Sequence, residues 1–204
     1  MAIYLIRHGE TASNAARIVQ TPDTVLSPRG IEQAERLAQR VGRAGITDIL
    51  SSDLPRAMMT AERLQAATGA ALHLDARLQE RNFGEVRGSA YADLPVDLFA
   101  ADYAPPGGES WGAFHARIDG LWPDIASAAT RVAGHLAVVT HGLVCYSLAL
   151  RHLALPAGVA VPMRWDNASL TVIAVSPAWR VTLLNCTTHL GSETYRDPQT
   201  LSGA

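Results

Sequence analysis

Cysteine is scarce in this sequence, with only Cys145 and Cys186 among 204 residues. No Cys-x-x-Cys pair and no spaced set of cysteines and histidines is present, which argues against a structural zinc site and against a disulfide framework. Both cysteines lie in apolar stretches, so two reduced thiols in or near the core are expected. A single disulfide between them is the alternative.

A dominant charge and long apolar runs are also lacking. The 17 Lys and Arg residues nearly balance the 19 Asp and Glu residues, so the formal net charge is −2. Such a chain lacks the basic surface of a nucleic-acid-binding protein, and any anion site must be a local cluster of positive charge. The apolar run at residues 1–6 is too short for a signal peptide or a membrane span. A soluble cytoplasmic protein is expected, with neither nucleic acid nor membrane as a partner.

What the sequence does contain is enough apolar material for a core, because 48% of its residues are hydrophobic. That content and the chain length fit a single domain over residues 1–204. Short apolar runs typical of strands alternate with amphipathic helical patterns, which predicts a three-layer α/β/α sandwich around a mainly parallel sheet. Residues 76–107 are irregular and rich in glycine, proline and aspartate, so a long loop or a small cap is expected there.

Two histidines follow predicted strands and precede glycines, in Arg7-His8-Gly9 and Thr140-His141-Gly142. Either tripeptide alone is more often a helix cap or a packed side chain. Together they fit a site, because ligands of α/β sheets bind beyond the carboxyl ends of the strands. A helix predicted after His141 would direct its N-terminus at an anion. Phosphate fits better than a metal, because metal-ligand spacings are absent and Arg7 would repel a cation.

Five sequence blocks in the same order resemble the histidine phosphatase superfamily, the phosphoglycerate mutase-like proteins. The resemblance covers most of the chain, and five collinear blocks are far more specific than one. The blocks are Leu5–Thr11 with Asn14, Ser51–Ala57 with Thr60 and Ala61, Leu78–Glu85 with Gly88, Pro106–Ser110, and Val139–Gly142.

The resemblance implies a role for each matching residue. His8 is expected to be the nucleophile that accepts a phosphoryl group, and Glu80 the proton donor to the leaving oxygen. Arg7, Arg56 and His141 are expected to hold the phosphate oxygens. Asn14 and Gly142 are expected to line the substrate site. The resemblance implies neither a metal nor another cofactor.

Elementary chemistry agrees with these roles. Phosphoryl transfer depends on positioning and on stabilising charge, and the planar guanidinium of arginine suits two oxygens at once. His8 should be unprotonated at its attacking nitrogen near neutral pH, because neighbouring positive charge disfavours an imidazolium. Glu80 should have a raised pKa, since it must hold a proton before the reaction. Glu85 is the rival carboxylate, interpreted as a solvated loop charge, and Glu10 is given a supporting role in its loop.

The family contains phosphatases and mutases, and the sequence favours a phosphatase. Mutases of this family carry a long insertion after the glutamate-bearing block, whereas only 18 residues lie between Gly88 and Gly107. The expected substrate is a small phosphorylated metabolite, and a homodimer is possible. A mutase, a non-catalytic phosphate-binding regulator and a metal-dependent hydrolase remain alternatives. The chain also departs from the family pattern: Thr21-Pro22 replaces a glycine after Gln20, and Val86-Arg87 replaces an aromatic–acidic pair.

Overall fold

The computed structural model describes residues 1–176 and 178–191, and a six-stranded β-sheet forms its centre. The spatial order of the strands is β3-β2-β4-β1-β5-β6. The first four in that order are mutually parallel, and β5 and β6 are antiparallel additions at one edge. The strands are β1 (Ala2–Arg7), β2 (Ile46–Ser51), β3 (Ala71–Leu74), β4 (His135–Thr140), β5 (Leu170–Ala174) and β6 (Val181–Cys186).

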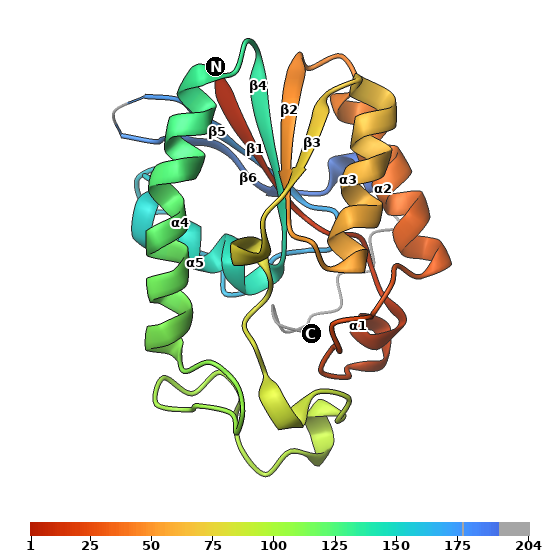
Figure 1. Ribbon diagram of the computed structural model, residues 1–204, viewed down its shortest axis with the longest axis vertical. Helices are drawn as coiled ribbons and strands as arrows, with labels where there is room; N and C mark the ends of the chain where they lie inside the picture. The colour runs from red at the N-terminus through yellow and green to blue at the C-terminus, as the bar shows by residue number, and fades with distance from the viewer. Residues whose placement is uncertain (177, 192–204) are drawn as a thin grey trace.

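Helices cover both faces of this sheet, so the predicted α/β/α sandwich is confirmed (Figure 1). α2 (Pro28–Val41) and α3 (Pro55–Thr68) lie on one face. α4 (Trp111–Arg131) and α5 (Gly142–His152) lie on the other. The short α1 (Ala12–Ala16) belongs to the loop between β1 and α2.

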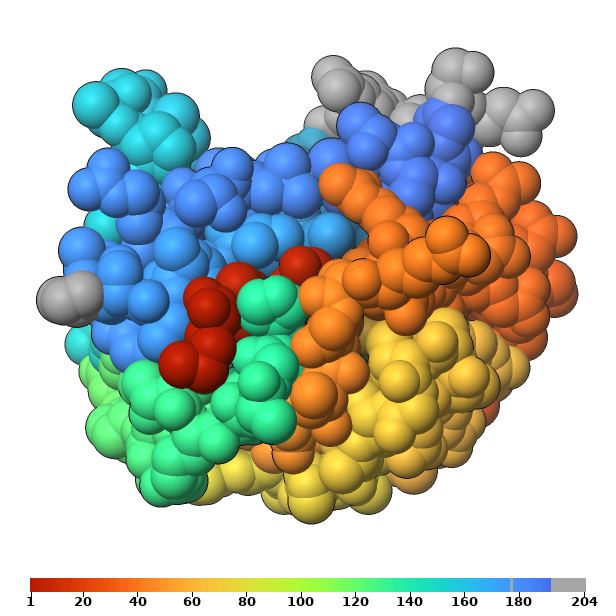
Figure 2. All heavy atoms as spheres, turned by 90° about the horizontal axis from the view of Figure 1, so that it is seen from above, coloured from red at the N-terminus to blue at the C-terminus, as the bar shows by residue number. Residues whose placement is uncertain are grey.

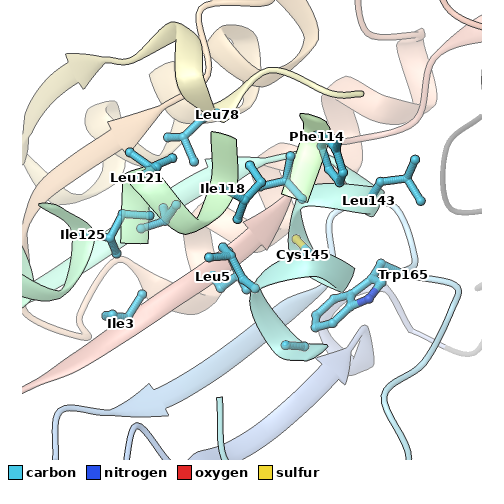
Figure 3. Close-up of a cluster of buried hydrophobic side chains, with 14 of the residues drawn as sticks. Ile3, Leu5, Leu78, Phe114, Ile118, Leu121, Ile125, Leu143, Cys145 and Trp165 are labelled. Carbon is cyan, nitrogen blue, oxygen red and sulfur yellow. The ribbon is translucent and has the colours of Figure 1, made fainter. Parts of the chain in front are cut away.

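The alternation of side chains along the strands produces two hydrophobic cores. Ile3 and Leu5 of β1 point to the face covered by α4 and α5, where they join Phe114 and Ile118 (Figure 3). Ile6 belongs to the core under α2 and α3. Because successive residues of a strand face opposite sides, one apolar strand can supply both cores at once.

Local sequence explains where the helices begin. Ser27 caps α2 by accepting a hydrogen bond from the Gly30 N–H, and Ser110 caps α4 by accepting one from the Ala113 N–H. The start of α3 has no such side-chain cap. Leu54 occupies the cap position without a side-chain bond, and Pro55 supplies the first helical residue.

Residues 76–107, called the cap segment below, contain three single-turn 3-10 helices: Ala76–Leu78, Gly84–Val86 and Tyr91–Asp93. The segment extends beyond the end of the sheet opposite the N-terminus (Figure 1). Figure 2 shows the other end of the molecule, where the N-terminus lies. Backbone hydrogen bonds join it to the loop after α1, from Gly88 N–H to Val19 O at 2.8 Å and from Val19 N–H to Ser89 O at 2.9 Å. The cap segment therefore has a fixed register against the N-terminal loop.

Both cysteines are free thiols, with Cys145 buried and Cys186 partly exposed, so the disulfide alternative is excluded. Among the described residues, no helix is both long enough and apolar enough to cross a membrane. The single-domain organisation stays a prediction, and its end at residue 204 lies outside the described residues.

Candidate active site

The pairing of β1 with β4 brings the two motif histidines together. Arg7 lies opposite Thr140 in this parallel pair, and the His8 N–H donates to the Thr140 carbonyl at 2.9 Å. His8 and His141 then leave the sheet side by side, with their ring centroids 5.1 Å apart and in an edge-to-face orientation. Both side chains are buried.

A backbone contact fixes the tautomer of His8. Its Nδ1 lies 2.7 Å from the Gly9 carbonyl oxygen, which can only accept, so Nδ1 carries the proton. Nε2 consequently keeps its lone pair. Burial lowers the pKa of His8 well below its usual range, and the charges of Arg56 and Arg7 lower it further. His8 is therefore neutral near pH 7, with a nucleophilic nitrogen.

His141 is held by the hydroxyl of Ser52, which lies 2.9 Å from its Nε2. That hydroxyl already accepts a hydrogen bond from the Leu54 N–H, which favours donation of its own proton to Nε2. Nδ1 is then the protonated nitrogen, and it is buried without a hydrogen-bond partner in the described structure. Burial, followed by the charge of Arg56, lowers the pKa of His141 well below its usual range. His141 thus presents a neutral N–H donor.

Two buried arginines supply the positive charge, and each is 2% exposed. Arg7 donates to the Trp165 carbonyl. Arg56 donates to the Thr21 carbonyl at 3.3 Å, while its buried Nε has no partner among the described residues. Burial lowers the pKa of Arg56 to about 10, so the guanidinium still carries its charge at neutral pH.

The Glu80 carboxyl bridges the cap segment and the start of α5. Its Oε1 accepts from the Arg81 N–H at 2.9 Å, and its Oε2 accepts from the Leu143 N–H at 3.2 Å. Leu78, two residues earlier, is buried in the core, and its carbonyl accepts from the Thr140 hydroxyl at 2.7 Å. Burial raises the pKa of Glu80, against the opposing effects of the two amides and of the arginines. The raised pKa expected from the sequence therefore arises within the protein itself.

Asn14 lies next to the His8 loop. Its Oδ1 accepts from the Thr11 N–H at 3.2 Å and from the Asn167 amide at 3.1 Å. Its Nδ2 is buried and has no partner within the described residues. Since the oxygen is fully used and the nitrogen is not, Asn14 can donate to an anion in the site.

The glycines of the two motifs serve the packing of the site. Gly9 lies against the carbonyl of Gly30 in α2 so closely that a Cβ would overlap it. The Gly9 N–H donates to the Thr60 hydroxyl at 3.2 Å, so it is not available to a ligand. Gly142 is the buried first residue of α5, between His141 and the amide that binds Glu80. Its part in binding substrate stays a prediction.

The neighbouring charged residues lie outside the cluster. Arg81 is buried, and its guanidinium donates to the carbonyls of Glu109, Leu98 and Tyr103, so it braces the cap segment. Glu85 is exposed, as expected for a solvated loop charge. Glu10 accepts from the Ser27 hydroxyl at 3.0 Å and thereby supports its loop.

Sequence reasoning missed three residues that hold the site. Ser52 orients His141 and Thr60 holds Gly9, and both lie in a block already quoted for its resemblance. The Asn167 amide donates to the carbonyls of His8 and Gly9, at 3.2 and 3.3 Å. No local signal in the sequence reveals this role of Asn167, because the contact spans more than 150 residues of chain.

The arrangement combines a neutral nucleophilic histidine, a second neutral histidine, two guanidinium groups and a carboxyl with a raised pKa. Such a set can hold a phosphate, accept a phosphoryl group and move a proton. The described residues include no group of three or more His, Cys, Asp or Glu side chains that could hold a metal ion.

Residues 3–187 match the family model of the histidine phosphatase superfamily (branch 1), and the chain belongs to this family. The members of this family are phosphatases and mutases that use a histidine, which supports the expectation that this protein is an enzyme.

The similar proteins include members of both kinds. "Probable phosphoglycerate mutase GpmB" of Yersinia pestis (strain Pestoides F) is 34% identical over 187 residues, which cover 84% of this chain and 83% of the relative. The structure of a mycobacterial glucosyl-3-phosphoglycerate phosphatase complexed with VO3 is 30% identical, with a TM-score of 0.75 over 91% of this chain and 99% of that chain. Bacillus stearothermophilus YhfR is 27% identical, with a TM-score of 0.79 over 93% and 98% of the two chains.

The lowered pKa values of His8 and His141 predict a loss of stability in mild acid. Each imidazole stays neutral in the folded protein, whereas in the unfolded chain it binds a proton below about pH 6.5. The unfolded state then binds more protons than the folded state. The free energy of unfolding should therefore decrease by about 1 kcal/mol per histidine as the pH is lowered from 7.5 to 5.5. Replacing His141→Gln should reduce this pH-dependent loss by about that amount in urea titrations.

An equal pH dependence in the wild type and His141→Gln would contradict the account.

Proposed function

We propose that this protein hydrolyses phosphomonoesters of small metabolites through a phosphohistidine intermediate on His8. The main support is the tautomer of His8, whose proton on Nδ1 is held by the Gly9 carbonyl and whose Nε2 keeps its lone pair. That nitrogen belongs to a buried cluster with Arg7, Arg56 and His141, all of which suit phosphate oxygens. The mycobacterial phosphatase, which is named for its activity on glucosyl-3-phosphoglycerate, agrees with this choice.

In the first step His8 Nε2 attacks phosphorus and the bond from phosphorus to the ester oxygen breaks. Glu80 gives its proton to the leaving oxygen, so the product is a neutral alcohol and Glu80 becomes a carboxylate. Arg7 and Arg56 offset the charge on the equatorial oxygens, and His141 donates from Nδ1. Because these donors are already fixed, they need little reorganisation as charge develops.

In the second step a water molecule attacks phospho-His8. The Glu80 carboxylate takes a proton from that water, the bond between nitrogen and phosphorus breaks, and inorganic phosphate leaves with His8 neutral again. The amides of Arg81 and Leu143 hold the Glu80 carboxyl in place throughout. One carboxyl thus serves as the acid and then as the base.

A phosphoglycerate mutase is the second candidate, favoured by the names of several relatives. A mutase must return the phosphoryl group to its substrate and shield it from water. Against this candidate, the cap segment is short, and the Arg81 guanidinium next to Glu80 donates to three backbone carbonyls.

We further propose that the reaction needs no metal, because Arg7 and Arg56 supply at the site the positive charge that a cation would supply. The cytoplasmic location, the homodimer and the roles of the individual site residues likewise stay predictions.

Product analysis separates the two candidates. With 3-phosphoglycerate as substrate, we expect inorganic phosphate to form faster than 2-phosphoglycerate, as followed by phosphorus NMR. The rate should persist in excess chelator, and vanadate should inhibit it. Isomerisation faster than phosphate release would favour the mutase, and loss of activity in the chelator would contradict the metal-free mechanism.

Glu80→Gln should slow both steps, since the first needs the proton of Glu80 and the second needs its carboxylate as a base. Removal of a general acid–base group typically costs on the order of 10²- to 10⁴-fold in rate, and alkyl phosphates should show that loss in kcat. p-Nitrophenyl phosphate has a leaving group that needs little protonation, so its first step should survive. The variant should then release a burst of p-nitrophenol equal to the enzyme, followed by a slow steady state.

Glu85→Gln, at the exposed neighbouring carboxylate, is the matched control and should behave as the wild type. Equal rates for the two variants would contradict the assignment of Glu80.

A further inference from the structure

We propose that Arg87 recognises a second anionic group on the substrate, a carboxylate or another phosphate, at the mouth of the pocket. The inference rests on the proposed function, because it concerns the part of a phosphomonoester that is not transferred.

Arg87 shares one open pocket with the catalytic candidates. The pocket is lined by side chains from three parts of the chain, including Gln20, Thr21, Arg56, Glu80, Phe83 and Arg87. Arg56 and Glu80 also belong to the buried cluster around His8, called the floor of the pocket below, where the phosphoryl group is expected to bind. Arg87 is half-buried on the cap side, and its positive charge contributes to the lowered pKa of Arg56, so the two charges lie close enough to repel each other.

No carboxylate in the described part of the chain lies within ion-pair distance of the Arg87 guanidinium. The carboxylate that acts on it electrostatically is Glu109. Both oxygens of Glu109 are already engaged, because they accept from Arg117 at 2.8 Å each and Oε2 also accepts from the Asn82 N–H at 2.8 Å. The Arg87 guanidinium therefore lines the pocket without a hydrogen bond to any of the described residues.

The backbone holds Arg87 in this position. Its N–H donates to Gly84 O, and the next residue, Gly88, donates to Val19 O at 2.8 Å. On the other wall, Arg56 donates to Thr21 O. Residues 19–21 thus tie the guanidinium on the floor to the guanidinium on the cap side. A side chain on such a fixed backbone loses less entropy when it binds a ligand.

The positive charge of the pocket is greater than one phosphoryl group at Arg7 and Arg56 would neutralise. Arg56 and Arg87 are both cationic, and Arg81 is committed to backbone carbonyls. Glu80 is the one carboxyl among the lining residues, and it holds a proton before the reaction if it is the general acid. A phosphoryl group on the floor would face Arg7 and Arg56, which leaves Arg87 for a second anion.

The test compares binding of matched esters to the His8→Ala protein, which cannot turn them over. Phosphoserine and phosphoethanolamine differ by a carboxylate, and glucose 1,6-bisphosphate and glucose 6-phosphate differ by a phosphate. Calorimetry should show tighter binding of the doubly anionic member in at least one pair, which identifies the group. Adding Arg87→Gln should reduce that preference by about tenfold, the usual effect of losing a charge-assisted hydrogen bond.

Arg87→Lys keeps the charge and should keep most of the preference. Arg43→Gln, at an exposed arginine just beyond α2, should leave it unchanged. An unchanged preference in Arg87→Gln, or an equal fall in Arg43→Gln, would overturn the inference. The ratio of kcat/KM values on the His8-containing protein gives the same comparison if His8→Ala does not fold. If the His8-containing protein hydrolyses no ester but the binding preference depends on Arg87, the proposed function fails and this inference stands.

Discussion

The parallel pairing of β1 with β4 is the constraint on which the site depends. Arg7 lies opposite Thr140, and the residue after each of them is a histidine. The His8 N–H continues the ladder to the Thr140 carbonyl, and the Thr140 hydroxyl donates to Leu78, which brings Glu80 to the same place. A register shift would turn these side chains to the other face of the sheet and separate the groups. The two cores that hold β1 and β4 in register are therefore also the support of the chemistry.

Burying this many polar groups has an electrostatic cost, and the structure limits it in two ways. The histidines are neutral because burial and nearby arginines lower their pKa values, and Glu80 moves toward its neutral form as its pKa rises. The remaining charge is positive, on Arg7 and Arg56, whose side chains are buried. Fixed donors in such surroundings act strongly on an anion, which is the basis of electrostatic catalysis.

Sequence alone predicted the order of strands and helices and the sites where histidines follow strands, because apolar periodicity and capping residues are local signals. The resemblance to the family supplied Arg56 and Glu80, whose place in the pocket no local pattern reveals. Contacts between distant segments could not be predicted. The bond of Asn167 to the His8 loop, the direction of Arg81 toward the cap segment and the packing of Gly9 against α2 all depend on the completed fold.

Direct detection of the phosphorylated residue tests the central claim most sharply. The protein would be mixed with a phosphomonoester, quenched in alkali, digested and analysed by mass spectrometry under conditions that preserve phosphohistidine. The account predicts an acid-labile phosphoryl group on the peptide that carries His8, and its absence in His8→Ala. A label on His141 or on another residue, or hydrolysis at the wild-type rate by His8→Ala, would contradict it.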